Sequence, residues 1–290
     1  MSLAEEIVKA QTLVEALPYI KRFSQKIVVV KYGGSLLSSP KQLVSLADDI
    51  ALLRYVGIRP VVVHGGGQEI NKWLDRIGKK PRMVEGQPFT DAETLQMIDM
   101  VLSGNISNAI VTSLGRVGVR AVGLSGRDAN LFTTRRIKTP KQKDLGYVGE
   151  IESTDVTLPS SLVDQGYVPV ISSVGVSRDG SVLNVDSDLV ASSMAAALRA
   201  SKLIYLASSS GISKGKRLIE FLDLSEAEDL LNSAELSSSL QIKLSAAVAA
   251  IKGGVTDVHI ISGTVERSLL LEIFTDKGIG TMVTNRKMKI

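Results

Sequence analysis

The fold is decided by Ile-Val-Val-Val-Lys-Tyr-Gly-Gly at residues 27–34 and by Arg-Pro-Val-Val-Val-His-Gly-Gly-Gly at residues 59–67. Runs of β-branched residues of this length are typical of buried strands, and apolar residues at helical spacing occupy residues 41–56 between them. Glycines directly after each run predict a tight turn into the next element. The two segments therefore predict a strand–helix–strand unit with parallel strands.

The same alternation continues through most of the chain. Further strand patterns lie at residues 119–124, 167–172, 202–207 and 256–261, and further helical patterns at residues 68–78, 91–115, 188–200 and 240–253. This alternation predicts an α/β fold, a three-layer α/β/α sandwich with a mostly parallel central sheet. Residues 130–137 and 146–152 read instead as short strands around a Lys-rich turn, and predict an antiparallel hairpin at the edge of a lobe.

The composition excludes several classes of protein. With 290 residues, 44% of them apolar and 22% charged, the chain can bury a large core and is not disordered. It has no Cys and only two His, which argues against disulfides and against a metal site built by the protein. We expect no nucleic-acid partner, since only 4% of residues are aromatic and the basic run at residues 135–143 resembles a solvated loop. We expect no contact with the membrane either, because no uninterrupted apolar stretch of about 18 residues occurs.

The first residues, Met-Ser-Leu-Ala-Glu-Glu, do not form a basic region followed by an apolar core. We therefore expect a cytoplasmic protein, or one of the plastid stroma if a transit peptide has been removed. A net charge of +4 suits small phosphates and carboxylates as ligands.

Two glycine-rich loops are candidates for binding an anion. Gly33 and Gly34 follow the first strand pattern, and Gly66 and Gly67 follow the second. Glycines let backbone N–H groups approach a ligand, and parallel sheets bind ligands at the carboxyl ends of their strands. Neither loop fits the Walker pattern or a complete GxGxxG, and a glycine turn after a strand often has only a structural role. Two such loops at successive strand ends nevertheless favour a phosphate or carboxylate site.

Charged residues near these loops are the next candidates. Lys31 closes an otherwise apolar strand, where an ammonium needs an anion or solvent, so we expect it to be functional. His64 is expected to cap or pack rather than to catalyse. Asp186 and Asp188 precede a helix of small residues, and either suits its N-cap while the other orients lysines. Lys243, at the start of an Ala-rich helix, would by itself be interpreted as a surface lysine.

An ordered set of motifs is more specific than any one loop. The set comprises Lys-Tyr-Gly-Gly at 31–34, His-Gly-Gly-Gly at 64–67, Gly-Leu-Ser-Gly-Arg-Asp-Ala at 123–129, Gly-Tyr-Val-Gly at 146–149, Asn184 with Asp188, and Gly-Ile-Gly-Thr-Met at 278–282. From about residue 5 to residue 283 the chain resembles the amino acid kinase family, most closely its members that act on N-acetyl-L-glutamate in arginine biosynthesis. The resemblance implies a carbamate kinase-like fold and transfer of the γ-phosphoryl group of ATP, with Mg²⁺, to the substrate's side-chain carboxylate, which forms an acyl phosphate.

The resemblance also implies a role for each candidate residue. Lys31 and Lys243 would flank the moving phosphoryl group, and Asp188 would hold both lysines. The implied substrate-binding positions are Gly66, Gly67, Asn184 and Pro88, and the implied nucleotide-binding positions are Gly33, Gly34, Ser208 and Gly211. Mg²⁺ would neutralise the nucleotide phosphates, and no residue is assigned to a metal.

Three parts of the chain follow from the resemblance. We expect a helical arm for oligomerisation at residues 1–25, an amino-acid-binding lobe at 26–180 and a nucleotide-binding lobe at 181–290. Apolar residues at helical spacing over 4–23 predict the arm helix, which Pro18 should break or bend. In hexameric, arginine-inhibited members such an arm interlaces dimers, so we expect a homo-oligomer, a dimer or a hexamer. The alternative is a helix packed on its own subunit.

The substrate segment departs from the family pattern. Members usually have Gly-Leu-Arg-Val-Thr where this chain has Gly-Gln-Pro-Phe-Thr at residues 86–90. Pro88 therefore stands where an arginine would clamp the substrate's α-carboxylate. Arg82 and Arg127 are the candidates to replace that cation.

Three further segments depart as well. The nucleotide segment at residues 206–212 lacks its usual aspartate, and the glycines that usually precede Lys243 are absent. In the arginine-effector region Arg267 stands in place of a His, while Glu272 and Gly280 are retained. A positive charge there should repel arginine.

These departures leave alternatives open. The chain is a kinase of N-acetyl-L-glutamate, a divergent kinase of another small carboxylate, or a catalytically weak homologue that serves as a regulatory subunit; retention of Lys31, Asp188 and Lys243 argues against the last. A dinucleotide-binding oxidoreductase is disfavoured because no complete GxGxxG occurs. Regulation by arginine or by a partner protein stays open.

Overall fold

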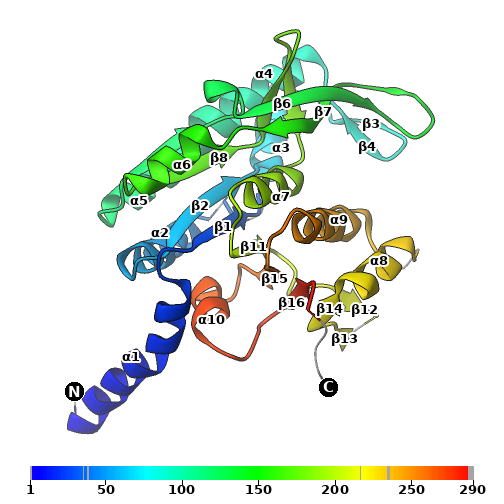
Figure 1. Cartoon of the computed structure of the whole chain (residues 1–290). Coiled ribbons are helices and arrows are strands. Elements are labelled where there is room, and N and C mark those ends of the chain that lie inside the picture. Colours follow the sequence, from blue (N-terminus) through cyan, green and yellow to red (C-terminus); the bar gives the residue numbers. More distant parts are fainter. Residues whose placement is uncertain (1, 35, 38, 216, 234–235, 287–290) are drawn as a thin grey trace.

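Eight strands form one sheet through the centre of the computed structural model, which describes residues 2–34, 36–37, 39–215, 217–233 and 236–286 (Figure 1). In spatial order they are β14 (Phe221–Asp223), β16 (Thr281–Thr284), β15 (Asp257–Ser262), β11 (Lys202–Ala207), β1 (Ile27–Tyr32), β2 (Arg59–His64), β8 (Val168–Ser172) and β5 (Ala121–Leu124). Among these described strands every neighbouring pair is parallel except β15 with β16. The mostly parallel sheet predicted from the alternating pattern is confirmed.

The central strands are apolar on both faces because helices cover both sides of the sheet. Val29 and Val61 point into one core, whereas Val28 and Val62 point into the other. The first core lies under α6 (Thr157–Asp164), α7 (Ser187–Ala197), α8 (Leu224–Asn232) and α9 (Ser238–Lys252), and the second under α2 (Pro40–Tyr55), α5 (Ser107–Arg116) and α10 (Ser268–Phe274). This burial of both faces explains why the strands read as continuous apolar runs rather than alternating ones, and it produces the three predicted layers.

The helical pattern at residues 91–115 is divided in the structure. It forms α4 (Ala92–Asp99), a π-helical segment (Met100–Ile106) and then α5. The Asp91 side chain caps α4 by accepting a hydrogen bond from the Thr94 amide. The shorter α3 (Gly67–Arg76) begins directly after the glycines that follow β2.

The predicted hairpin is part of a larger unit. β6 (Phe132–Lys138) and β7 (Asp144–Thr154) pair antiparallel, as expected. With β9 (Val174–Ser177) and β10 (Val182–Val185) they close into a small barrel. Two shorter hairpins are β3 (Arg82–Val84) with β4 (Gln87–Phe89), and β12 (Ser213–Lys214) with β13 (Arg217–Leu218).

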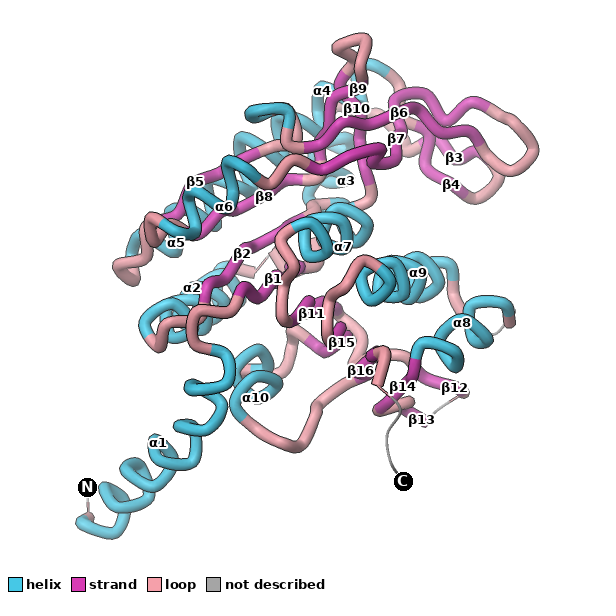
Figure 2. Tube along the Cα trace, viewed as in Figure 1, coloured by secondary structure: helices cyan, strands magenta, loops and turns pink. Residues whose placement is uncertain are grey.

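The amino-terminal helix α1 (Leu3–Phe23) extends away from the sheet, as Figures 1 and 2 show. It runs through Pro18 without a break, so of the two effects expected at that residue the break does not occur. Phe23 at its end is buried, whereas Ile7 and Val14 are 56% and 64% exposed. No described helix is both long and apolar enough to cross a membrane.

Candidate active site

Three charged residues from distant parts of the sequence meet at one point. Lys31 comes from the end of β1, Asp188 from the first turn of α7 and Lys243 from α9. The Lys31 Nζ lies 2.7 Å from Asp188 Oδ1, and the Lys243 Nζ lies 2.6 Å from Asp188 Oδ2. All three residues are buried, so these ion pairs form in a medium that screens charge weakly.

The charge balance of this cluster favours an anion. Burial raises the pKa of Asp188, but the cations of Lys31 and Lys243 outweigh it and leave that pKa below its ordinary value. Burial, and then the charge of Lys31, lower the pKa of Lys243, while Asp188 opposes the shift. Two ammonium groups therefore face the Asp188 carboxylate, and the Asp186 carboxyl, whose pKa burial raises, lies beside them. The site can therefore neutralise an incoming phosphate or carboxylate.

The two aspartates at the start of α7 divide the roles that the sequence left open. Asp186 is the N-cap, and its Oδ1 accepts hydrogen bonds from the amides of Asp188, at 2.7 Å, and Leu189, at 3.3 Å. Asp188 is thereby free to bind the lysines. Burial, followed by the neighbouring Asp188 charge, raises the pKa of Asp186.

The two glycine loops lie against each other beside this cluster. A side chain at Gly34 would come within 3.0 Å of the Gly67 nitrogen and 3.2 Å of the Gly66 Cα. No acceptor among the described residues bonds the amides of Gly34, Gly66 or Gly67, and Gly66 and Gly67 begin α3, whose N-terminal dipole favours an anion. Gly33 differs, because its amide donates to the Leu206 carbonyl at 2.9 Å. It permits close strand packing rather than offering a free donor.

The remaining predicted residues lie near the same edge of the sheet. Asn184 is on β10, which leads into Asp186 and α7. Ser208 and Gly211 follow β11, beside the end of β1. Gly211 has φ of +141°, and a side chain there would meet Thr281 Oγ1 at 2.7 Å, so its glycine is required by packing.

His64 is fully buried at the end of β2, which fits the expected packing role. Its Nδ1 lies 3.1 Å from the Gly65 carbonyl, and its Nε2 has no partner among the described residues. Burial lowers the pKa of His64 to about 4, and it is neutral at pH 7.

Pro88 lies on the exposed β3–β4 hairpin, and the two candidate replacement cations differ in their contacts. Both terminal nitrogens of Arg127 donate to Asp99 at 2.9 Å, so its guanidinium is engaged. The Arg82 guanidinium lies 4.2 Å above the Phe89 ring, and no described carboxylate pairs with it. Arg82 is therefore the available cation of the two.

Comparison with known proteins identifies the family of this chain. Residues 26–262 match the model of the amino acid kinase family. The chain belongs to the amino acid kinase family. An acetylglutamate kinase from Methanothermobacter thermautotrophicus is 45% identical to this kinase, over 94% of this chain and 98% of the relative. One from Methanocaldococcus jannaschii is 42% identical, over 98% and 99% of the two chains.

Solved structures agree with this assignment. N-acetylglutamate synthase from Neisseria gonorrhoeae, complexed with coenzyme A and N-acetyl-glutamate, has a TM-score of 0.86 and 32% identity over 96% of this chain. This kinase spans 64% of that synthase. Carbamate kinase from Giardia lamblia bound to AMP-PNP, at 15% identity and a TM-score of 0.66, shares the fold alone. The family and fold predicted from the motifs are confirmed.

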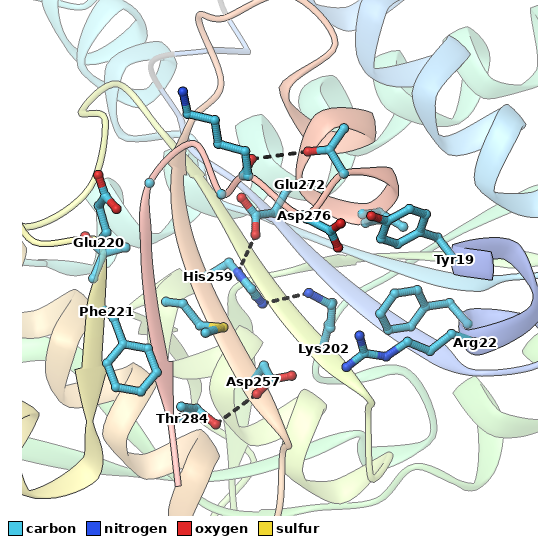
Figure 3. A pocket seen from close by; sticks show the side chains of 18 of the residues that line it. Tyr19, Arg22, Lys202, Glu220, Phe221, Asp257, His259, Glu272, Asp276 and Thr284 are labelled. Carbon is cyan, nitrogen blue, oxygen red and sulfur yellow. Dashed lines mark hydrogen bonds and ion pairs between the residues drawn. The ribbon is translucent and has the colours of Figure 1, made fainter. Parts of the chain in front are cut away.

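A cavity of about 700 Å³ lies apart from the charged cluster, at the amino ends of β11 and β15 (Figure 3). Inside it the Lys202 Nζ lies 2.8 Å from His259 Nε2, and His259 Nδ1 lies 2.5 Å from Glu272 Oε1. Burial lowers the pKa of His259 and of Lys202. Sequence reasoning missed Lys202, although a lysine in an apolar strand is the same signal that identified Lys31.

Arg267 lies outside the lining of this cavity. Glu272 and Gly280, the two residues retained in the effector region, line the cavity, whereas Arg267 does not. Its guanidinium pairs with Asp49 at 2.8 Å and Asp48 at 3.1 Å on α2, on the other side of α10. Two carboxylates therefore neutralise the Arg267 guanidinium, and its effect on arginine stays a prediction.

Proposed function

We propose that this protein transfers the γ-phosphoryl group of ATP to the side-chain carboxylate of N-acetyl-L-glutamate and forms an acyl phosphate. The observation that carries the proposal is the buried Lys31–Asp188–Lys243 cluster at the carboxyl ends of the strands. Similarity to acetylglutamate kinases over nearly the full chain supports the choice of substrate.

The chemistry of the reaction suits these residues. A carboxyl group with an ordinary pKa near 4.3 is ionised at neutral pH, so its oxygen can attack phosphorus without a general base. The obstacle is to bring two anions together. Lys31 and Lys243 neutralise the phosphoryl oxygens, and Asp188 fixes the distance between the two ammonium groups. The free amides of Gly34, Gly66 and Gly67 add donors at the same point.

Substrate is held by Asn184, the Gly66–Gly67 turn and Arg82. Arg82 replaces the cation that Pro88 removes, because it lies on the same hairpin and has no carboxylate partner among the described residues. A cation is needed there because the α-carboxylate of the substrate is ionised. This assignment distinguishes the pocket from one that uses an arginine at position 88.

ATP lies over residues 181–290, with Gly33, Gly34, Ser208 and Gly211 bordering its phosphates and base, and the amino acid lies over residues 26–180. The described residues contain no group of three His, Asp or Glu side chains suited to a metal, and both Asp188 oxygens bind lysines. Mg²⁺ is commonly held by substrate phosphates and water with one or two carboxylates. Mg²⁺ therefore enters with ATP. The use of ATP also fits a cytoplasmic location.

The experiment is a coupled ADP-release assay with MgATP, in which hydroxylamine traps acyl phosphate. The panel comprises N-acetyl-L-glutamate, L-glutamate, L-aspartate and longer N-acetylated homologues. We expect turnover with N-acetyl-L-glutamate. Turnover only with another acid would replace this substrate assignment, and no turnover together with no ATP binding by calorimetry would favour a regulatory subunit.

The kinase is a homo-oligomer, assembled in part through α1. Leu3, Ile7, Val14 and Leu17 lie on one stripe of the helix and are 45–77% exposed. Their spacing of four, seven and three residues is that of a coiled-coil seam. A second copy of α1 would bury this stripe.

The cavity at the amino ends of β11 and β15 is an effector site for L-arginine. Its lining carries four acidic residues, Glu220, Asp257, Glu272 and Asp276, together with the cations Arg22, Lys202, Lys277 and Arg286. The N. gonorrhoeae synthase, also solved with coenzyme A and L-arginine, is 31% identical over 96% of this chain, with a TM-score of 0.82. We expect L-arginine to raise the thermal midpoint of the wild type and not of Glu272→Gln. Equal shifts in both proteins would place arginine elsewhere.

A further inference from the structure

Tyr205 adjoins every member of the charged cluster. It lies on β11, is fully buried, and its hydroxyl donates to the backbone carbonyl of Asp188 at 3.0 Å. The Lys243 Nζ lies 5.1 Å from the centroid of its ring. In the sheet its register partner on β1 is Lys31. A fourth structural element thus reaches the point where β1, α7 and α9 meet.

We propose that Tyr205 is a positioning residue for phosphoryl transfer, whose ring stabilises the Lys243 ammonium and whose hydroxyl holds the first turn of α7 so that Asp188 meets both lysines. The inference rests on the proposed kinase function and deepens it. Tyr205 does not touch the reacting atoms. It acts through Lys243 and Asp188.

The surroundings of Tyr205 show why packing alone does not account for a tyrosine. The core cluster around it consists mostly of Val, Leu, Ile and Ala, with Phe132 as its other buried aromatic residue among the described ones. A phenylalanine would fill nearly the same space without a polar atom to satisfy. Burial, followed by the charges of Asp188 and Asp186, raises the pKa of Tyr205 well above its ordinary value. Its hydroxyl is therefore a permanent donor.

The Tyr205 ring faces Lys243, whose charged form some neighbouring groups favour and others oppose. The groups that face Lys243 are Lys31 on β1, Asp188 and Asp186 at the start of α7, and the Tyr205 ring on β11. Burial and Lys31 favour the neutral amine, whereas both aspartates favour the ammonium. The negative face of the Tyr205 ring, like the two aspartates, favours the ammonium form of Lys243. Since only the ammonium neutralises phosphoryl oxygens, loss of the ring should make the enzyme lose activity at a lower pH.

Two substitutions separate the ring from the hydroxyl. In Tyr205→Phe the ring remains, so we expect kcat to fall about three- to tenfold, KM to change little, and the basic limb of the kcat profile to stay in place. In Tyr205→Leu we expect kcat to fall roughly 30-fold or more, and the basic limb to move about half to one pH unit lower. Leu203→Ala is the matched control, because Leu203 lies on the same strand and in the same core. It should lose stability without moving the basic limb.

A second measurement does not depend on turnover. In protein labelled with ε-¹³C-lysine, the Lys243 Cε resonance, assigned through Lys243→Arg, should titrate at a lower pH in Tyr205→Leu than in the wild type. Equal titration midpoints, or a basic limb that moves equally in Leu203→Ala, would overturn the inference. A wild type inactive on every acid would refute the proposed function, and the Lys243 titration would still decide the role of Tyr205.

Discussion

Asp188 is the residue on which the charge balance of the site depends. Each of its oxygens binds one lysine, at 2.7 Å and 2.6 Å, so neither lysine can move without leaving a buried charge unpaired. Asp186 has a different task, since it caps α7 and fixes the turn that carries Asp188. The two ammonium groups of the cluster are available to a ligand only while both lysines are protonated.

Replacing Lys31 tests that balance directly. We expect Lys31→Met to lower kcat at least about a thousandfold, because the phosphoryl group loses one of its two cations. The midpoint of thermal unfolding should stay near that of the wild type, because Asp188 keeps its bond to Lys243. Lys252→Met, which removes an exposed lysine paired with Glu228, is the control and should retain activity. A kcat within tenfold of wild type for Lys31→Met would remove Lys31 from the mechanism.

His64 gives a prediction for stability against pH. Its pKa is about 4 in the folded protein and about 6.5 when unfolded, so the unfolded chain binds the proton more readily. The contribution of neutral His64 to the free energy of unfolding is fully present above pH 6.5 and is lost as the pH falls toward 4. We expect urea unfolding to show a loss on the order of 2 kcal/mol between pH 7 and pH 4.5 that is smaller in His64→Gln. His259 is present in both proteins. If the free energy of unfolding falls equally in both, protonation of His64 is not the cause of the pH dependence.

At the level of elements, the β3–β4 hairpin is the part of the proposed site in which the sequence departs from the family pattern at the substrate cation. Pro88 removes a guanidinium from it, and Arg82, paired across the strands with Phe89, retains one. We expect Arg82→Ala to raise the KM for N-acetyl-L-glutamate roughly tenfold or more with little change in kcat, which is typical of a lost charge-assisted contact.

Adding a guanidinium at position 88 should have the opposite effect. Pro88→Arg in the Arg82→Ala background should recover most of the lost affinity, and Lys80→Ala, an exposed cation just before the hairpin, is the control. If Arg82→Ala leaves KM unchanged, another group binds the α-carboxylate.

The elements also show what periodicity can predict. The six strand patterns named from β-branched runs all appear in the main sheet, because burial on both faces leaves a continuous apolar signature. β9 and β10 were not predicted. Each has only four residues, and Asp179 and Gly180 between them read as a loop, so the closed barrel depends on pairings that no local pattern contains.

At the scale of the whole molecule, the site depends on contacts between residues far apart in the chain. Lys31 could be singled out because an ammonium in an apolar strand is costly. Lys243 looked like a surface residue, and only the resemblance to a family linked it with Asp188. The position of Arg267 could not be predicted, since its partners Asp48 and Asp49 are more than 200 residues away in the sequence.

Assembly is the other property of the whole molecule. We expect the double variant Ile7→Ser and Val14→Ser to form a smaller species than the wild type by light scattering, because these side chains lie on the exposed stripe of α1. Val8→Ser is the matched control, since Val8 is 64% exposed but lies beside the stripe. An unchanged mass for the double variant would assign the assembly to another surface.

Phosphoryl transfer to the side-chain carboxylate is tested by following the oxygen that attacks phosphorus. N-acetyl-L-glutamate with ¹⁸O in its side-chain carboxylate is incubated with MgATP and the wild-type protein, and the products are observed by ³¹P NMR. We expect an acyl phosphate resonance displaced by a bridging ¹⁸O with the wild type, and no such resonance with Lys31→Met. An acyl phosphate without the isotope displacement, or none at all while ATP is bound, would contradict transfer to that carboxylate.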